Sequence, residues 1–333
     1  MDKNFKLYIA GHNGMVGSAI MRKFSGEGYA NIVTMTKEVL DLRNQQIVTQ
    51  FFQTEKPEYV IIAAAKVGGI LANNRYRAEF LYDNLMIQSN IIHAAYQYGV
   101  KKLIFLGSSC IYPRDCPQPI KEEYLLTGPL EQTNEPYAIA KITGLKLCEN
   151  YYRQYGCNFY SVMPTNLYGQ NDNFDLATAH ALPALMRKFH EAKTSPLTPL
   201  LSKERGVVVW GSGKPRREFM HVDDLAEAIY FLMNSVEAFD IYDQGITHLN
   251  IGTGEDITIS ELALLVSDTI GYKGGIIYDS SKPDGTPRKL LDVTRIHNLG
   301  WKHNIDLKTG IERTYKWYRE MFRIKNEKLE IKN

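Results

Sequence analysis

Short apolar runs alternate with longer helical patterns over residues 1–165. The runs are rich in β-branched and aromatic residues, and the stretches between them repeat apolar positions at helical spacing. Such alternation is typical of a parallel sheet with helices on both faces, so the pattern predicts a doubly wound α/β fold. The predicted strands are KLYIAG (6–11), NIVTM (31–35), EYVIIAAA (58–65), KKLIFLGS (101–108) and NFYSVM (158–163).

Beyond Pro164 the pattern becomes irregular, which predicts a smaller α/β substrate-binding domain rather than a continued sheet. We expect residues 1–165 to bind a cofactor and residues 166–333 to form mainly the smaller domain, with the chain crossing back between the two. The Pro-, Ser- and Thr-rich segment 193–206 is expected to be a surface insertion. The elements predicted here are strands at 207–210, 248–252 and 275–279 and helices at 259–270 and 311–322.

Composition narrows the class of partner. The chain has 333 residues and a net charge of +2, with Lys and Arg scattered, so it offers no electrostatic footprint for a nucleic acid or an anionic membrane. A small molecule is the expected partner. No apolar run reaches about 18 residues and a strand-like segment begins at once, so we expect a cytoplasmic protein. Its four cysteines lack paired spacing and are expected to be free thiols.

A glycine-rich turn follows the first predicted strand. In IAGHNGMVGSAI, Gly11, Gly14 and Gly17 end a strand and open a helix, so that the backbone can approach a pyrophosphate at the helix N-terminus. The alternative is an ordinary strand-to-helix turn, but the βαβ context favours a Rossmann-type dinucleotide site. The loop residues expected at the cofactor are Gly11, His12, Asn13, Gly14, Met15, Val16 and Gly17.

The segment after the second strand bears on the choice of dinucleotide. It lacks the acidic residue that would bind an NAD ribose, and TMTKE puts Lys37 where a 2′-phosphate would lie. This favours NADP over NAD, although a solvated surface lysine is the alternative. Asp41 and Leu42 are expected to contact the adenine edge.

A Tyr-x-x-x-Lys pair lies on a helix predicted to begin near Pro136. The i, i+4 spacing puts Tyr137 and Lys141 on one helix face. Lys141 is expected to lower the pKa of the tyrosine and to hold the nicotinamide ribose, so that the phenol exchanges a proton with a carbonyl or alcohol. Ser108 or Ser109 of GSSC is expected to donate a hydrogen bond to the same substrate oxygen.

Together these motifs resemble the extended short-chain dehydrogenases/reductases, and within them the GDP-L-fucose synthase family. The resembling stretches are AGHNGMVGSAI, AAAKVGGILANN, LGSSCIYP, NEPYAIAKI, MPTNLYG, VVWGSGKPRREFMHVDD and KPDGTPRKLLD, which span almost the whole chain. The resemblance implies 3,5-epimerisation and NADPH-dependent 4-reduction of GDP-4-keto-6-deoxy-D-mannose by a homodimer. By the same analogy, the long helical stretches 79–98 and 136–155 are expected to form the dimer faces.

The resemblance also implies roles for individual residues, matched by motif. Ser108, Tyr137 and Lys141 would form the reductase triad. The other cofactor contacts would be Leu106, Gly107, Ser109, Pro164, Thr165, Asn166, Leu167 and His180. The GDP-sugar contacts would be Lys188, Trp210, Arg217 and Asp284, residue types suited to a diphosphate and to an aromatic or ribose face. No residues are expected to hold a metal ion.

Epimerisation needs two further groups, because Tyr137 is committed to O4. A 4-keto group acidifies C3–H and C5–H, and inversion requires a base on one face of the sugar and an acid on the other. Cys110, two residues past Ser108, is the candidate base, and His180 is the candidate acid from the second domain. The alternative is that Cys110 only fills space and His180 only contacts the cofactor.

Two residues depart from the pattern of the family, and three have a structural alternative. Asn13 and Lys37 stand where members of the family often have arginine, so we expect NADPH use with reduced discrimination against NADH. Three residues could have a structural role instead of binding the GDP-sugar. Trp210 could belong to the interdomain core, Lys188 could be a solvated helix charge, and Arg288 could pair with a surface carboxylate.

Two other classes of function remain open at this point. A nucleotide-sugar 4-epimerase or 4,6-dehydratase shares the fold, but a dehydratase would want an acidic residue where this chain has Ser109 and Cys110. A non-catalytic dinucleotide sensor has no need of the intact Ser108, Tyr137 and Lys141.

Overall fold

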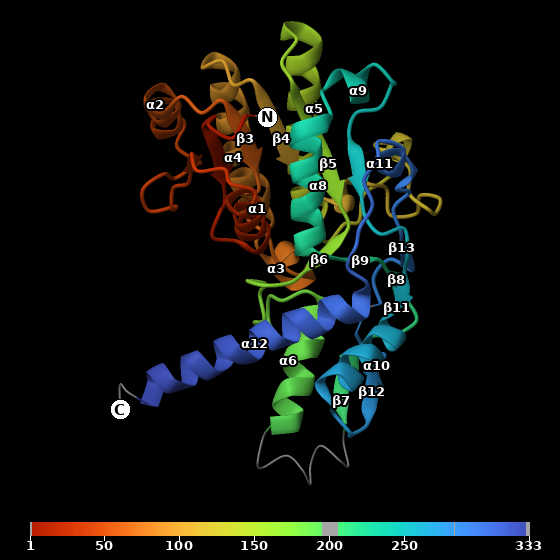
Figure 1. Cartoon of the computed structure of the whole chain (residues 1–333). Helices are drawn as coiled ribbons and strands as arrows, with labels where there is room; N and C mark the ends of the chain where they lie inside the picture. The colour runs from red at the N-terminus through yellow and green to blue at the C-terminus, as the bar shows by residue number, and fades with distance from the viewer. Residues whose placement is uncertain (1, 195–205, 283, 331–333) are drawn as a thin grey trace.

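A six-stranded parallel sheet forms the first layer of the structure. The computed structural model describes residues 2–194, 206–282 and 284–330. In the sheet the strand order is β10-β5-β4-β3-β1-β2, and every pairing is parallel (Figure 1). The strands are β1 (Leu7–Ala10), β2 (Ile32–Val33), β3 (Tyr59–Ile62), β4 (Lys102–Leu106), β5 (Phe159–Pro164) and β10 (Leu249–Ile251).

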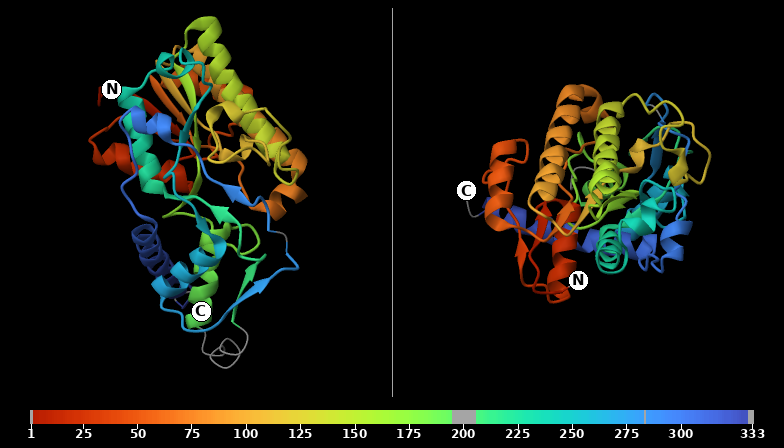
Figure 2. Two further views of the ribbon diagram at one scale, coloured as in Figure 1. Left: turned by 90° about the vertical axis from the view of Figure 1, so that its right-hand side faces the viewer. Right: turned by 90° about the horizontal axis from the view of Figure 1, so that it is seen from above.

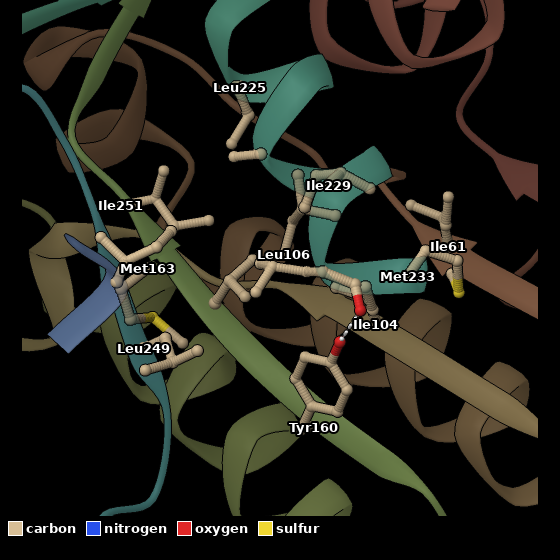
Figure 3. Packing of buried hydrophobic residues seen from close by; sticks show 14 of the residues in the cluster. Ile61, Ile104, Leu106, Tyr160, Met163, Leu225, Ile229, Met233, Leu249 and Ile251 are labelled. Carbon is tan, nitrogen blue, oxygen red and sulfur yellow. Dashed lines mark hydrogen bonds between the residues drawn. The ribbon is translucent and has the colours of Figure 1, made fainter. Parts of the chain in front are cut away.

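Helices cover both faces of this sheet, because the central strands are apolar on both sides. Helices α1 and α8 pack on one face and α4 and α5 on the other, as the view from above shows (Figure 2). On the first face, Leu225, Ile229 and Met233 of α8 lie against β4 and β5 (Figure 3). The covering helices are α1 (Met15–Gly26), α2 (Gln45–Glu55), α4 (Arg77–Gln97), α5 (Glu135–Tyr155) and α8 (Val222–Ser235).

The second layer has its own core beneath the sheet, in the lower half of Figure 1. Buried residues of α6, α10, α12 and β7 pack together there, including Phe189, Val266 and Ile311. Its helices and strands are α6 (Ala181–Thr194), β7 (Val207–Trp210), β8 (Arg216–Arg217), β11 (Ile257–Thr258), α10 (Ile259–Ile270), β12 (Ile276–Asp279), β13 (Arg288–Lys289) and α12 (Leu307–Glu330).

Several short elements complete the fold, and among them β6 pairs with β9. They are α3 (Ile70–Arg75), the 3₁₀ turns η1 (Ser109–Ile111) and η2 (Glu122–Tyr124), β6 (Asn166–Tyr168), β9 (Phe219–His221), α9 (Phe239–Tyr242) and α11 (Thr294–Asn298). Within the described ranges, no helix is both long and apolar enough to cross a membrane.

The doubly wound sheet and its five N-terminal strands are confirmed, and α10 has the predicted bounds. The placement of 248–252 in the smaller domain is wrong, because β10 pairs with β5 at the edge of the main sheet. A short apolar run encodes a strand but not its partner. The insertion predicted at 193–206 falls mostly on 195–205, outside the described residues. The domain boundary at 165 stays a prediction.

Glu218 joins the two layers. It lies between β8 and β9, is fully buried, and accepts hydrogen bonds from the backbone N–H groups of Thr253, Gly254 and Leu291 at 2.6, 2.8 and 3.0 Å. Its own carbonyl accepts from the Asn166 side chain at 2.8 Å. The carboxylate therefore holds the segments after β10 and β13 together, and the backbone carbonyl of the same residue holds them against β6.

We expect Glu218→Gln to lower the free energy of unfolding by about 2 kcal/mol, since the amide NH₂ would face a backbone donor and a charged acceptor would be lost. Urea unfolding followed by circular dichroism measures this. Glu255→Gln, an exposed change in the same region, is the matched control. Equal stability of the two variants would contradict the role of Glu218.

Candidate active site

The carboxyl ends of β1, β4 and β5 meet at one edge of the sheet, where parallel α/β folds bind ligands. The glycine loop follows β1, Gly107 and Ser108 follow β4, and Pro164 ends β5. Thr165 continues from β5, donating its N–H to the Ile251 carbonyl at 2.9 Å. The structure thus brings the segments predicted to bind a cofactor to one place.

The three glycines of the loop differ in how closely the surrounding backbone approaches them. Gly11 has φ +87°, and a Cβ there would lie 2.7 Å from Ala64 Cα. A Cβ on Gly17 would lie 2.1 Å from the Gly11 carbonyl oxygen. Gly14 is the N-cap residue of α1. A Cβ there would lie 3.5 Å from the same Gly11 oxygen, which is an ordinary van der Waals contact. Protein packing therefore requires Gly11 and Gly17, whereas Gly14 leaves open the space where a pyrophosphate would approach the helix.

Lys37 and Asp41 lie beyond β2, as predicted. Lys37 is exposed, and the described residues give it no hydrogen bond or ion pair. Asp41 is held by Arg43, with 2.7 Å between Oδ2 and Nη2, and this contact lowers the pKa of Asp41 to about 2. Arg43, which also contacts Asp83 at 3.3 Å, was missed by the sequence reasoning despite its place in DLRN. Leu42 packs against the core under α2 and α4.

Tyr137 and Lys141 lie on α5 at the end of β4. Lys141 donates to the Leu106 carbonyl at 2.8 Å, and its Nζ is 4.7 Å from the Phe105 ring centroid and 5.8 Å from that of Tyr137. Burial lowers the pKa of Lys141 to about 8. Burial also raises the pKa of Tyr137, with Cys110 adding to the rise, so the expectation that Lys141 lowers it is wrong. In this arrangement the phenol stays protonated and is suited to act as an acid.

Ser108 is the serine that faces Cys110. Its Oγ accepts from the Cys110 N–H at 3.4 Å, while Ser109 is buried within η1. Burial raises the pKa of the Cys110 thiol, and the charge of Lys289, the Ser108 hydroxyl and the charge of Lys141 oppose that rise. All four cysteines are free thiols in the structure, as predicted.

His180 approaches the same site from the second layer. It lies just before α6, exposed to solvent, in a loop anchored by a 3.0 Å hydrogen bond from the Gly69 N–H to the Thr178 carbonyl. The surrounding protein lowers the pKa of His180, and the charge of Lys289 lowers it further. Cys110 and His180 therefore both lie within the electrostatic reach of one cation.

That cation, Lys289, is a site residue that the sequence reasoning missed. It lies on β13, opposite Arg217 in the parallel pairing with β8, and lines a cavity with Cys110. Burial lowers the pKa of Lys289, and Cys110 opposes this. Lys289 belongs to KPDGTPRKLLD, but nothing in that stretch marks which of its cations faces the cysteine.

Lys188 and Trp210 lie together on α6 and β7. Lys188 Nζ donates to the Val208 carbonyl at 2.9 Å and lies 5.6 Å from the Trp210 ring centroid. Trp210 is 49% exposed, so the alternative that it is interdomain core is wrong. An exposed aromatic plane beside a cation is suited to a nucleotide.

Arg217 and Asp284 lie close enough to interact electrostatically. Asp284 accepts hydrogen bonds from Ser212 N and Oγ at 2.6 and 2.7 Å, so its carboxylate fixes the turn after β7. Arg288 instead pairs with Asp256 at 2.5 Å, which confirms the alternative of a carboxylate partner, although the Asp256 side chain is buried.

Comparison with known proteins gives a consistent set of relatives. The family model for the NAD dependent epimerase/dehydratase family matches residues 7–252. A putative GDP-L-fucose synthase 2 of Arabidopsis thaliana is 56% identical, over 96% of this chain and 93% of its own. The GDP-L-fucose synthase of Escherichia coli K12 is 54% identical, over 95% and 97%. The solved structure of a GDP-mannoheptose C4 reductase from Campylobacter jejuni with NADP bound has a TM-score of 0.88 and 44% identity, covering 96% and 99%.

We expect Lys289→Met to raise the pKa of the Cys110 thiol, because a cation that stabilises the thiolate is removed. The thiolate form would then appear only at higher pH. The pH dependence of Cys110 alkylation by iodoacetamide, followed on the Cys110 peptide by mass spectrometry, measures this shift. Lys282→Met, an exposed change on the second layer, is the control. An unchanged alkylation profile would show that Lys289 does not act on the cysteine.

Proposed function

The chain belongs to the NAD dependent epimerase/dehydratase family, and from that premise we propose that it makes GDP-L-fucose. The substrate is GDP-4-keto-6-deoxy-D-mannose, which is epimerised at C3 and C5 and then reduced at C4, with NADP(H) as the cofactor. The observation that carries the proposal is the meeting of Cys110, Tyr137 and Lys141 at the end of β4, with His180 brought in from the second layer.

The cofactor site fits a dinucleotide on this chain's own residues. The open space at Gly14 admits the pyrophosphate to the N-terminus of α1, and the exposed Lys37 is available for a 2′-phosphate. Lys141 holds the nicotinamide ribose, next to the Leu106 carbonyl that it already contacts. Bound NADPH supplies a hydride to C4 of the sugar.

Epimerisation comes first, on the keto sugar. The Cys110 thiolate removes a proton from C3 or C5, and the electron pair moves toward O4, where Ser108 and Tyr137 donate hydrogen bonds. His180 returns a proton to the opposite face of the same carbon. Proton exchange with solvent then restores Cys110 and His180, so solvent hydrogen enters the product at both inverted centres.

Reduction follows at C4. As the hydride arrives, Tyr137 transfers its phenolic proton to O4, and the ketone becomes an alcohol. The raised pKa of Tyr137 suits this step, because the phenol must be protonated when reduction begins. Lys188, Trp210 and Arg217 hold the GDP moiety on the second layer.

The alternatives fit the site less well. A 4-epimerase or 4,6-dehydratase would leave the paired Cys110 and His180 without a task, and η1 has no acidic side chain. A non-catalytic dinucleotide sensor would leave Tyr137 and Ser108 without one. We further propose that the protein works as a cytoplasmic homodimer that uses the exposed faces of α4 and α5.

Incubation of the purified protein with GDP-4-keto-6-deoxymannose and NADPH tests the proposal. Loss of NADPH absorbance coupled to the appearance of GDP-L-fucose is expected. Consumption of the keto sugar with NADPH untouched would overturn the reductase assignment.

We expect Cys110→Ser and Tyr137→Phe to separate the two half-reactions. Without the thiol, deuterium incorporation at C3 and C5 from D₂O, followed by NMR without NADPH, is lost, while hydride transfer continues and releases an unepimerised 6-deoxy sugar. Without the phenol, NADPH oxidation falls by about 10² to 10⁴, while dinucleotide binding persists. Wild-type exchange in Cys110→Ser would leave the cysteine as a packing residue.

We expect Lys37→Ala to weaken NADPH binding by about tenfold and NADH binding hardly at all, because a single charged contact to the 2′-phosphate is removed. Fluorescence titration with both dinucleotides measures this. Lys302→Ala, another exposed lysine, is the control. Equal losses for both dinucleotides would make Lys37 a surface charge only.

A further inference from the structure

A small cavity opens beside Cys110, and one of its polar groups has no partner among the described residues. Cys110, Tyr112, Arg114, Asn134 and Lys289 are among the residues that line it. The carboxamide oxygen of Asn134 is buried and accepts no hydrogen bond, and the described residues offer none to its nitrogen. A buried carboxamide oxygen that accepts no hydrogen bond destabilises the protein, so it calls for an explanation.

The expected task of this asparagine is to cap a helix, and it does not do so. Asn134 is the N-cap residue of α5, where asparagine usually accepts from the second or third N–H of the helix. The second helical residue is Pro136, which has no N–H. The side chain makes no cap hydrogen bond.

The backbone fixes where the side chain lies. Asn134 N–H donates to the Glu131 carbonyl at 3.2 Å, and its own carbonyl accepts from the Ala138 N–H at 3.0 Å. Three residues further along α5 comes Tyr137, and Cys110 lines the same cavity as Asn134. The carboxamide is thus held at the site of both half-reactions.

The chemistry of the cavity indicates what the carboxamide binds. Arg114 and Lys289 bring positive charge to the lining, and Glu131 lies 3.7 Å from Arg114. A neutral amide beside them offers both a donor and an acceptor, which matches a hydroxyl group that also does both. The proposed substrate carries such hydroxyls on C3, which is one of the two carbons that Cys110 is proposed to deprotonate, and on C2 beside it.

We propose that the Asn134 carboxamide is a positioning residue that hydrogen-bonds a ring hydroxyl of the hexose and holds the sugar against Cys110. The effect of Asn134 on epimerisation rests on the proposed function. Its hydrogen bond to the sugar does not. The orientation matters because base and carbon must meet in a narrow range of geometry, and a small misplacement costs rate steeply.

Asn134→Ala tests the proposal through stability and exchange together. We expect the ligand-free variant to unfold at the same urea concentration as the wild type or a higher one, because a buried oxygen without a hydrogen-bond donor is removed. Deuterium exchange at C3 and C5 falls about tenfold or more, and more unepimerised reduced sugar is released, while NADPH affinity is unchanged. A parallel loss of stability and exchange would make Asn134 structural, and unchanged exchange would also overturn the role. Thr133→Ala, the preceding residue, is the matched control and is expected to leave exchange intact.

A binding experiment separates this inference from the proposed reaction. Calorimetry with GDP and with GDP-mannose measures what the hexose adds to affinity. We expect that increment to shrink about threefold to tenfold in Asn134→Ala, with GDP affinity unchanged. If the wild type shows the increment but fails to process the keto sugar, the reaction is wrong and the hexose subsite stands. An increment equal in wild type and variant overturns the subsite, whatever the reaction.

Discussion

The site depends on one constraint, that all strands of the main sheet run in the same direction. Parallel pairing brings the carboxyl ends of β1, β4 and β5 to a single edge, although these strands end at Ala10, Leu106 and Pro164, far apart in the chain. Three segments lie close together because they follow these strand ends: the glycine loop, the Ser108–Cys110 turn and the residues after Pro164. Glu218 then fixes the second layer against it, so that Arg217 and Lys289 approach from the other side.

Burial sets the electrostatic balance of the site. Taking charge out of water lowers the pKa of Lys141 to about 8 and raises that of Cys110. The protein around the more exposed His180 lowers the pKa of that side chain as well. Each shift favours the neutral form. Lys289 acts in opposite directions on the proposed acid and base, because its charge favours a thiolate at Cys110 and disfavours an imidazolium at His180. The charge of Lys289 therefore favours the reactive form of the proposed base and disfavours that of the proposed acid.

The sequence predicts what is encoded locally and leaves out what depends on the second layer. Strand periodicity, the glycine spacing and Tyr137-x-x-x-Lys141 are all short-range signals, and the elements that carry them lie where they were expected. The position of β10 depends on contacts with β5 made about 85 residues away along the chain. The sign of the pKa shift at Tyr137 depends on enclosure, which spacing does not reveal. In the sequence Asn134 looks like an ordinary N-cap residue of α5. Only the structure shows that its side chain makes no cap hydrogen bond, next to a Pro136 that has no N–H to donate.

The place of β10 has a consequence for how the protein is made. Strand β5 leaves the ribosome long before β10 and before α8, whose apolar side chains cover one face of the sheet. Until residue 251 has been synthesised, β5 has no partner on one side, and until residue 235 the part of the sheet that α8 covers is open. An unpaired strand edge and an open apolar face both invite aggregation. The main sheet therefore becomes complete only after α6, β7 and β8 of the second layer have been synthesised.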